Sequence, residues 1–176
     1  MDITLRPLPQ EDEERFIRRI QAAFQKAVDE RYGPSEEPVL PRADVLACFA
    51  AEGAETYAIL RDGEDVGGAV LAIHPETGRN ELQLLFIDID RHSEGVGVAA
   101  WRAIEALHPE TVVWETCTPW FERRNLHFYL NKCGFHAVEF FCANHPEPDA
   151  PQDAPSEEGF FRFEKWMRPD QPRPAL

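Results

Sequence analysis

Short runs of alternating apolar and polar residues predict the first elements of the chain. Ile3 and Leu5 alternate with polar neighbours and precede two prolines, which predicts a short first strand. Apolar residues recur at helical spacing over 16–27, and this pattern predicts a helix that ends before Gly33. A second, shorter helix is expected over residues 43–51.

The middle of the chain has the pattern of a three-stranded meander. Runs rich in β-branched and apolar residues over 56–61 and 66–73 flank Asp62 and Gly63, a pair that is typical of a tight hairpin turn. A third strand is expected over 81–88 after a further turn.

The second half of the chain is expected to contain two more helices and three more strands. In chain order they are a helix over 95–107, a strand over 111–117, a helix from Pro119 to about Cys133, and strands over 135–142 and 159–166. A proline-rich acidic segment over 143–158 is predicted to be a solvated loop.

Composition and charge restrict the class of protein. The chain has 176 residues, of which 43% are hydrophobic, so we expect one domain over residues 1–168, of one or two packed halves, and a mobile tail over 169–176. No apolar run is long enough to span a membrane, and the start lacks a signal peptide, so a cytoplasmic protein without a membrane partner is predicted. The net charge of −14 repels phosphate backbones, which argues against nucleic acid and allows a cationic substrate.

Cysteine, histidine and aromatic residues add little specific chemistry. The four cysteines form no CxxC pair and are predicted to be buried free thiols. No histidines stand at metal-ligand spacing, so no metal site is predicted. Three aromatic residues could line an acceptor pocket, although a core position is favoured: Trp114, Trp120 and Phe121.

The segment 84–101 is the first with a pattern typical of ligand binding. An apolar strand passes through a polar turn into Gly95 and Gly97, which open an apolar helix. Alternate glycines let the backbone approach a ligand, and the free amides at a helix start favour an anion such as a pyrophosphate. The pattern is neither a Walker loop nor a dinucleotide fingerprint, and a glycine pair can also serve only a tight turn.

The order of the elements, together with two motifs, resembles the GNAT acetyltransferase superfamily over residues 3–167. The motifs are His92-x-x-Gly95-x-Gly97 and a segment over 124–135 that contains Asn125 and Tyr129 and ends in Gly-Phe. This resemblance implies an α/β (α+β) domain with a mixed, mostly antiparallel sheet of six to seven strands flanked by about four helices. It also implies acetyl-CoA as co-substrate.

The resemblance also assigns cofactor contacts. The pantetheine arm would pair with the backbone of Leu85, Phe86 and Ile87. Asn125 would contact the cofactor, and Tyr129 would lie near its sulfur. The pyrophosphate would be held by the amides of His92, Ser93, Glu94, Gly95, Val96, Gly97 and Val98.

Two residues depart from the family pattern in this loop. His92 stands where the family has Gln or Arg, but its backbone amide can still donate. Glu94 places a carboxylate beside the expected pyrophosphate, which weakens binding unless the side chain points outward or pairs with Arg91.

Acetyl transfer to an amine requires a base and benefits from an acid. An amine with a pKa of about 10.4 is mostly protonated at pH 7, so exposing its lone pair costs roughly 4.6 kcal/mol. Glu81 is the candidate base because it shares one strand face with Gln83 and Leu85; the alternative is an exposed carboxylate at a strand end. Asp88 would face the other way unless a bulge re-aims it. Tyr129 is the candidate acid, with a core tyrosine as the alternative.

The sequence therefore predicts an N-acetyltransferase that moves an acetyl group directly to a primary amine of a small molecule or peptide. A catalytically silent acyl-CoA-binding domain is the alternative, and an acidic protein that only binds a cationic partner is a third. The acceptor stays open. A homodimer is compatible with the family resemblance.

Overall fold

A computed structural model describes all residues except 35, 37, 92–94, 149–158 and 169–176. Within the described residues, seven strands form one mixed sheet in the order β1-β2-β3-β4-β5-β7-β6, and four α-helices accompany it. The chain divides into two compact units, with β4 (Arg79–Ile87) shared between them. The predicted tail lies outside the described residues.

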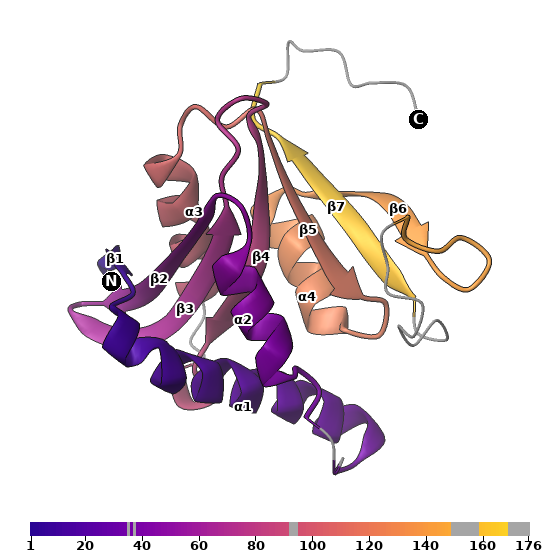
Figure 1. Ribbon diagram of the computed structural model, residues 1–176, viewed down its shortest axis with the longest axis horizontal. Helices are drawn as coiled ribbons and strands as arrows, with labels where there is room; N and C mark the ends of the chain where they lie inside the picture. The colour runs from indigo at the N-terminus through magenta and orange to yellow at the C-terminus, as the bar shows by residue number, and fades with distance from the viewer. Residues whose placement is uncertain (35, 37, 92–94, 149–158, 169–176) are drawn as a thin grey trace. The chain divides into compact units, whose positions relative to one another are not determined.

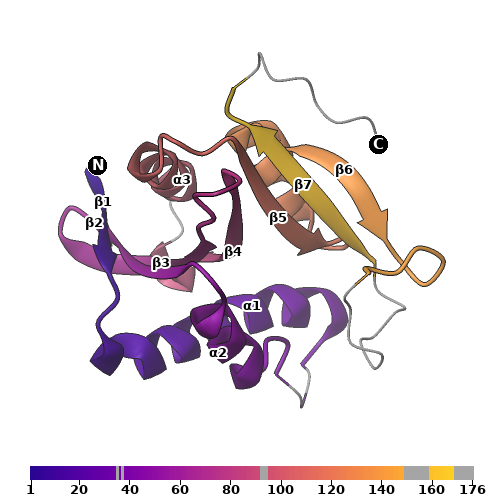
Figure 2. The same cartoon turned by 45° about the horizontal axis from the view of Figure 1, so that its top comes forward.

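Unit 1 comprises Met1–His74 and Leu82–Pro109. Its elements besides the end of β4 are β1 (Ile3–Pro7), α1 (Glu13–Tyr32), α2 (Arg42–Ala50), β2 (Ala54–Arg61), β3 (Glu64–Ala72), α3 (Val96–Leu107), and the 3-10 turns η1 (Gln10–Asp12) and η2 (Ile89–Arg91). Helices α1 and α2 lie on one face of the unit 1 strands, and α3 lies on the other (Figures 1 and 2).

The core of unit 1 forms where the apolar stripe of α1 meets the inner face of β3 and β4. Phe16 and Ile20 of α1 are buried with Val70 of β3 and Phe86 of β4. The rings of Phe16 and Phe86 meet edge to face with centroids 5.1 Å apart. Burying such a side chain contributes about 1.5–3 kcal/mol, so this cluster fixes α1 against the strand that carries the candidate cofactor residues.

Unit 2 comprises Pro75–Glu81 and the chain from Glu110 onward. Its elements besides the start of β4 are β5 (Val113–Pro119), α4 (Arg123–His127), the π-helical segment η3 (Phe128–Cys133), β6 (His136–Phe141) and β7 (Phe160–Trp166). Strand β7 pairs antiparallel with both β5 and β6. The ring of Tyr129 lies 5.8 Å from that of Phe163, so the α4–η3 segment packs on one face of these strands.

Two backbone features bear on the strands around the site. Asp62 and Gly63 have φ values of 51° and 86°, which confirms the predicted hairpin because this turn requires two positive φ angles. Gly67 in β3 has no room for a side chain, since a Cβ atom would lie 2.3 Å from the carbonyl oxygen of Phe86. β3 therefore approaches the backbone of β4 at Phe86 more closely than any other residue type would allow.

Several predicted boundaries need correction. β4 begins at Arg79, so Glu81 is its third residue and not its first. Pro119 does not start a helix: it ends β5, where it pairs with Phe160, and α4 begins at Arg123. The Gly134 cap is confirmed with φ 79°.

The cysteines follow the prediction only in part. All four are free thiols, but only Cys133 is buried, while Cys48 and Cys142 are half-buried. Cys117 is exposed, because it lies on the face of β5 opposite the α4–η3 segment. Trp114 and Phe121 are core residues, as favoured, while Trp120 is exposed. None of the described helices is long and apolar enough to cross a membrane.

Candidate functional site

The glycine loop of unit 1 ends in a helix start with free amides. Gly95 caps α3 in the left-handed region, with φ 95° and ψ −13°, a conformation that costs other residues roughly 1–2 kcal/mol. The amide of Ala99 donates to the Gly95 carbonyl at 2.8 Å. Among the described residues, the amides of Val96, Gly97 and Val98 have no helical acceptor because they precede this first bond, and an anion at the positive end of the helix dipole can accept from them.

The rest of the predicted loop is only partly described. His92, Ser93 and Glu94 lie outside the described residues, so their predicted contacts stay predictions. Arg91 donates to both carboxylate oxygens of Glu64, at 2.9 and 2.5 Å. This ion pair gives Arg91 a partner other than the predicted Glu94.

Strand β4 presents two different faces in unit 1. Leu85 and Ile87 are half-buried on the face that they share with Gln83, whereas Phe86 points to the opposite face, into the core. The ladder between β4 and β5 pairs Arg79–Glu81 with Val113–Glu115. The ladder ends before Leu85, Phe86 and Ile87. The backbone of these residues is therefore not paired with β5, and it is the stretch predicted to pair with an extended ligand.

Two polar side chains in and just after β4, Gln83 and Asp88, differ in whether they already have a partner. Asp88 follows β4 and is held by the guanidinium of Arg19, with oxygen to nitrogen distances of 2.7 and 3.0 Å. Its carboxylate is therefore already committed to an ion pair. The Oε1 atom of Gln83 is buried and has no hydrogen-bond partner among the described residues, so it is an acceptor that a ligand could use.

In unit 2, Asn125 and Tyr129 are brought together on one side of β5. The Nδ2 atom of Asn125 donates to the Oγ1 atom of Thr118 at 3.3 Å. The hydroxyl of Tyr129 is hydrogen-bonded to Thr116. The sequence analysis did not identify either threonine. The pattern that could have indicated them is a pair of hydroxyl residues at alternate positions of a predicted buried strand.

Tyr129 is buried within an aromatic cluster. Only 7% of it is exposed, and its ring meets Phe128 and Phe135 edge to face at 5.2 and 5.5 Å. Burial raises the pKa of its phenol, while the hydrogen bond with Thr116 acts in the opposite direction. The ring of Tyr129 is therefore a core residue, which was the alternative to a catalytic role. Its hydroxyl remains protonated at neutral pH.

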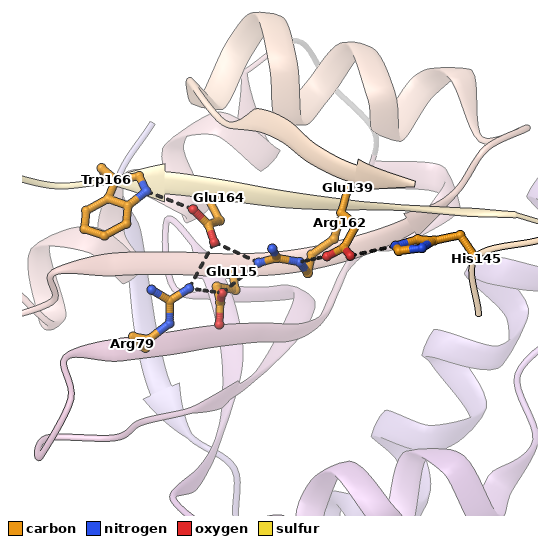
Figure 3. Close-up of polar contacts among 7 residues, drawn as sticks. All are labelled: Arg79, Glu115, Glu139, His145, Arg162, Glu164 and Trp166. Atoms are coloured by element: carbon orange, nitrogen blue, oxygen red, sulfur yellow. Dashed lines mark hydrogen bonds and ion pairs between the residues drawn. The ribbon is translucent and has the colours of Figure 1, made fainter. Parts of the chain in front are cut away.

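The opposite face of the unit 2 strands carries a network of ion pairs (Figure 3). Arg162 of β7 donates to Glu115, Glu139 and Glu164 at 3.0, 3.0 and 2.8 Å. Arg79 of β4 donates to Glu115 and Glu164. Two further contacts extend the network, from the Trp166 indole to Glu164 and from His145 to Glu139.

The pairing lowers the pKa of two carboxylates of this network, Glu139 and Glu164. Hydrogen bonds from His145 and Arg162 lower the pKa of Glu139. Burial acts to raise the pKa of Glu164, but its hydrogen bonds, the one from Arg162 first, outweigh burial and the pKa is lowered. The network was not predicted from the sequence.

Glu81 lies at the border of this charged face. It pairs in register with Glu115 across the parallel ladder, and it alternates with Arg79 onto the same face. Within the described part of the chain, Glu81 makes no ion pair, while Glu115 is bound by two guanidiniums. Glu81 is thus on the face of unit 2 opposite to that of Asn125 and Tyr129.

Comparison with known proteins identifies the family. Residues 17–135 match the model of the acetyltransferase (GNAT) family, which is well over half of the chain. This protein belongs to the GNAT acetyltransferase family. The predicted family and the predicted GNAT-like fold are therefore confirmed.

Relatives of this GNAT protein include one of unknown activity and several of known structure. It is 46% identical over 161 residues, covering 87% of both chains, to the uncharacterized protein YrkN of Bacillus subtilis (strain 168). The PaiA N-acetyltransferase of Thermoplasma acidophilum, solved in complex with coenzyme A, is 17% identical with a TM-score of 0.67, over 94% of this chain and 99% of that one.

A GNAT family acetyltransferase of Elizabethkingia anophelis, solved with acetyl-CoA bound, is a second structural match. It is 14% identical with a TM-score of 0.64, over 93% of this chain and 97% of that one. At these identities the structural likeness shows the fold alone.

Proposed function

We propose that this GNAT-family protein is an acetyl-CoA-dependent N-acetyltransferase that moves the acetyl group directly to a primary amine. The observation that carries the proposal is the placement of two reactive groups on opposite faces of one short sheet. Tyr129 lies on the α4 side of β5, and Glu81 lies on the charged side. Both groups must act at one thioester, so the thioester would lie beyond the end of the β4–β5 ladder at Glu81 and Glu115, where the two strands no longer pair.

Acetyl-CoA would bind through backbone groups at two places in unit 1. The amides of Val96, Gly97 and Val98 would hold the pyrophosphate at the start of α3. The backbone of 85–87, beyond the ladder with β5, would pair with the amides of the pantetheine arm. Asn125 would contribute its Oδ1 atom, since the bond from Nδ2 to Thr118 fixes the amide plane. Both CoA and acetyl-CoA are bound by the similar structures named above.

The chemistry requires three proton transfers: two away from the amine nitrogen and one to the leaving sulfur. Glu81 would accept a proton from the ammonium group of the acceptor, directly or through a water molecule, which frees the lone pair. The amine nitrogen then forms a bond to the thioester carbonyl carbon, and the carbon–sulfur bond breaks. Tyr129 would donate its proton to the departing sulfur, and its phenolate would regain a proton from the acylated nitrogen, directly or through water. The products are then the neutral N-acetyl amide and free CoA, and Glu81 returns its proton to solvent. Because the pKa of Tyr129 is raised by burial, the phenol holds that proton at neutral pH.

The charged face favours a cationic acceptor. Among the described residues it carries four carboxylates, from Glu81, Glu115, Glu139 and Glu164, against the guanidiniums of Arg79 and Arg162. The excess of carboxylates attracts an ammonium group. Small-molecule amines and peptide amines both satisfy this requirement.

Thiol release from acetyl-CoA, measured over a panel of small amines and basic peptides, tests the proposal. Sustained release with any amine is expected. A rise in melting temperature with CoA but no release with any amine would support the silent acyl-CoA-binding alternative. Absence of any CoA-dependent rise would argue for the acidic binding protein.

Two variants test the assigned roles. Tyr129→Phe should lower kcat about 100-fold, in the range for loss of a general acid, while the melting-temperature rise with CoA is retained. Glu81→Gln should lower kcat similarly at pH 7, and high pH should recover part of the loss because the amine then deprotonates without help. Wild-type turnover in either variant would remove that residue from the mechanism.

A further inference from the structure

Strand β5 buries two threonine hydroxyls against the α4–η3 segment. Thr116 and Thr118 are 6% and 2% exposed, and they alternate with Cys117 onto one face of the strand. A buried hydroxyl without a partner is unfavourable, so valine is the usual residue of this shape in such a position. Both hydroxyls here contact a side chain of the proposed site.

The spacing of the two contacts follows from the geometry of the elements. Thr118 accepts from Asn125 at 3.3 Å, and Thr116 is bonded to the hydroxyl of Tyr129. Two strand residues span about 6.7 Å, and four helical residues rise about 6 Å. The pair on β5 therefore matches the Asn-x-x-x-Tyr pair, with the two segments running in opposite directions.

The backbone of Tyr129 is fixed separately from its side chain. Its carbonyl oxygen accepts hydrogen bonds from the amides of Gly134 and Phe135, which end the π-helical segment. The ring is held by the aromatic cluster. Rotation of the hydroxyl is the freedom that remains, and within the described part of the chain Thr116 is hydrogen-bonded to it.

We propose that Thr116 and Thr118 are positioning residues of the transferase, Thr116 for the Tyr129 hydroxyl and Thr118 for the Asn125 amide. A hydrogen bond from Thr116 to the phenol oxygen leaves the phenol proton directed away from β5, toward the leaving sulfur. The bond from Asn125 Nδ2 to Thr118 turns Oδ1 toward the ligand. This inference rests on the proposed function, and it assigns each threonine to a different step.

Matched substitutions separate the two roles. Thr116→Val should lower kcat about tenfold and leave the KM for acetyl-CoA within about twofold, the size expected for one lost hydrogen bond. Thr118→Val should raise the calorimetric Kd for CoA about fivefold and change kcat at saturating acetyl-CoA by less than about twofold. Thr116→Ser and Thr118→Ser, which keep the hydroxyl, should restore most of each loss.

Double-variant cycles distinguish positioning from a general loss of packing. The Thr116→Val effect on kcat should disappear in a Tyr129→Phe background, and the Thr118→Val effect on Kd should disappear in an Asn125→Ala background. The control is Thr111→Val, since Thr111 is also buried and accepts from an asparagine, Asn80, at 2.7 Å. It should lower the melting temperature and leave both kcat and Kd unchanged.

Additive effects in both cycles, or equal changes in kcat and Kd in all three valine variants, would overturn the proposal. The Thr118 cycle measures only the Kd for CoA, so it gives a result even if no acceptor amine is found. Wild-type kcat in Tyr129→Phe would refute the acid of the proposed function, and a coupled Thr118 cycle would still support positioning of Asn125. The two failures are therefore distinguishable.

Discussion

Arg162 joins more carboxylates than any other residue of the charged face, and its removal is a sharp test of that network. The guanidinium contacts Glu115, Glu139 and Glu164 at 3.0, 3.0 and 2.8 Å (Figure 3). Its side chain is 25% exposed, and that of Glu164 is 12% exposed. The contacts are thus partly shielded from water, and Arg162→Met keeps the length of the stem while removing the charge.

The expected loss lies between the values for exposed and buried pairs. An exposed ion pair contributes at most about 1 kcal/mol, and a hydrogen bond to a charged group contributes about 1.5–3 kcal/mol. Arg79 still neutralises Glu115 and Glu164 in the variant, which limits the damage. We expect the free energy of unfolding to fall by about 2–3 kcal/mol and the melting temperature by about 5–10 °C for a protein of this size.

The loss should depend on pH in a defined direction. The pKa values of Glu139 and Glu164 are lowered from 4.5 in the folded protein. Near pH 4.5 the unfolded chain therefore binds protons that the folded protein does not, so stability falls as pH falls through the folded values. The contribution of Arg162 is complete above that pH, and the difference between wild type and Arg162→Met should narrow between pH 5 and pH 3.

Calorimetry of both proteins from pH 7 to pH 3 measures this difference. Arg162→Lys serves as the control, because it keeps the charge but cannot contact three carboxylates with one planar group; an intermediate melting temperature is expected. A difference that stays constant over the whole pH range, or a variant as stable as wild type at pH 7, would refute this account of the network.

Two further predictions concern the cofactor strand and loop. Gly95→Ala should lower the free energy of unfolding by about 1 kcal/mol because Gly95 has a positive φ, and it should reduce the melting-temperature rise with CoA. The control is Gly63→Ala, since Gly63 also has a positive φ, of 86°, and has open space around it. This variant should lose a similar amount of stability and keep the full rise with CoA. Gln83→Leu should raise the melting temperature of the free protein, because it removes a buried acceptor without a described partner. It should also raise the KM for the amine, measured by thiol release. A lower melting temperature would contradict this account.

The parts of the site that were predictable from the sequence are those set by local pattern. Gly95 was identified because a glycine pair between an apolar strand and an apolar helix is recognisable over a few residues. The Asn125 and Tyr129 spacing is similarly local, and the alternation of β4 predicted which residues share a face with Glu81. The roles of these residues stay predictions until they are measured.

The parts that could not be predicted depend on contacts between distant residues. Arg79 and Glu164 are 85 residues apart in the chain, and no spacing rule joins them. Pro119 was assigned to a helix start because proline is favoured there, but pairing with Phe160 extends β5 through it. Tertiary pairing decided that boundary against the local preference.

The network also narrows the choice of base in a way that sequence alone could not. Of the four carboxylates on the charged face, Glu115, Glu139 and Glu164 each accept a hydrogen bond from a guanidinium. For Glu139 and Glu164 these hydrogen bonds lower the pKa, so each is a weaker proton acceptor. Glu81, which pairs in register with Glu115 and makes no ion pair among the described residues, is left as the carboxylate of this face that can accept a proton without breaking such a pair.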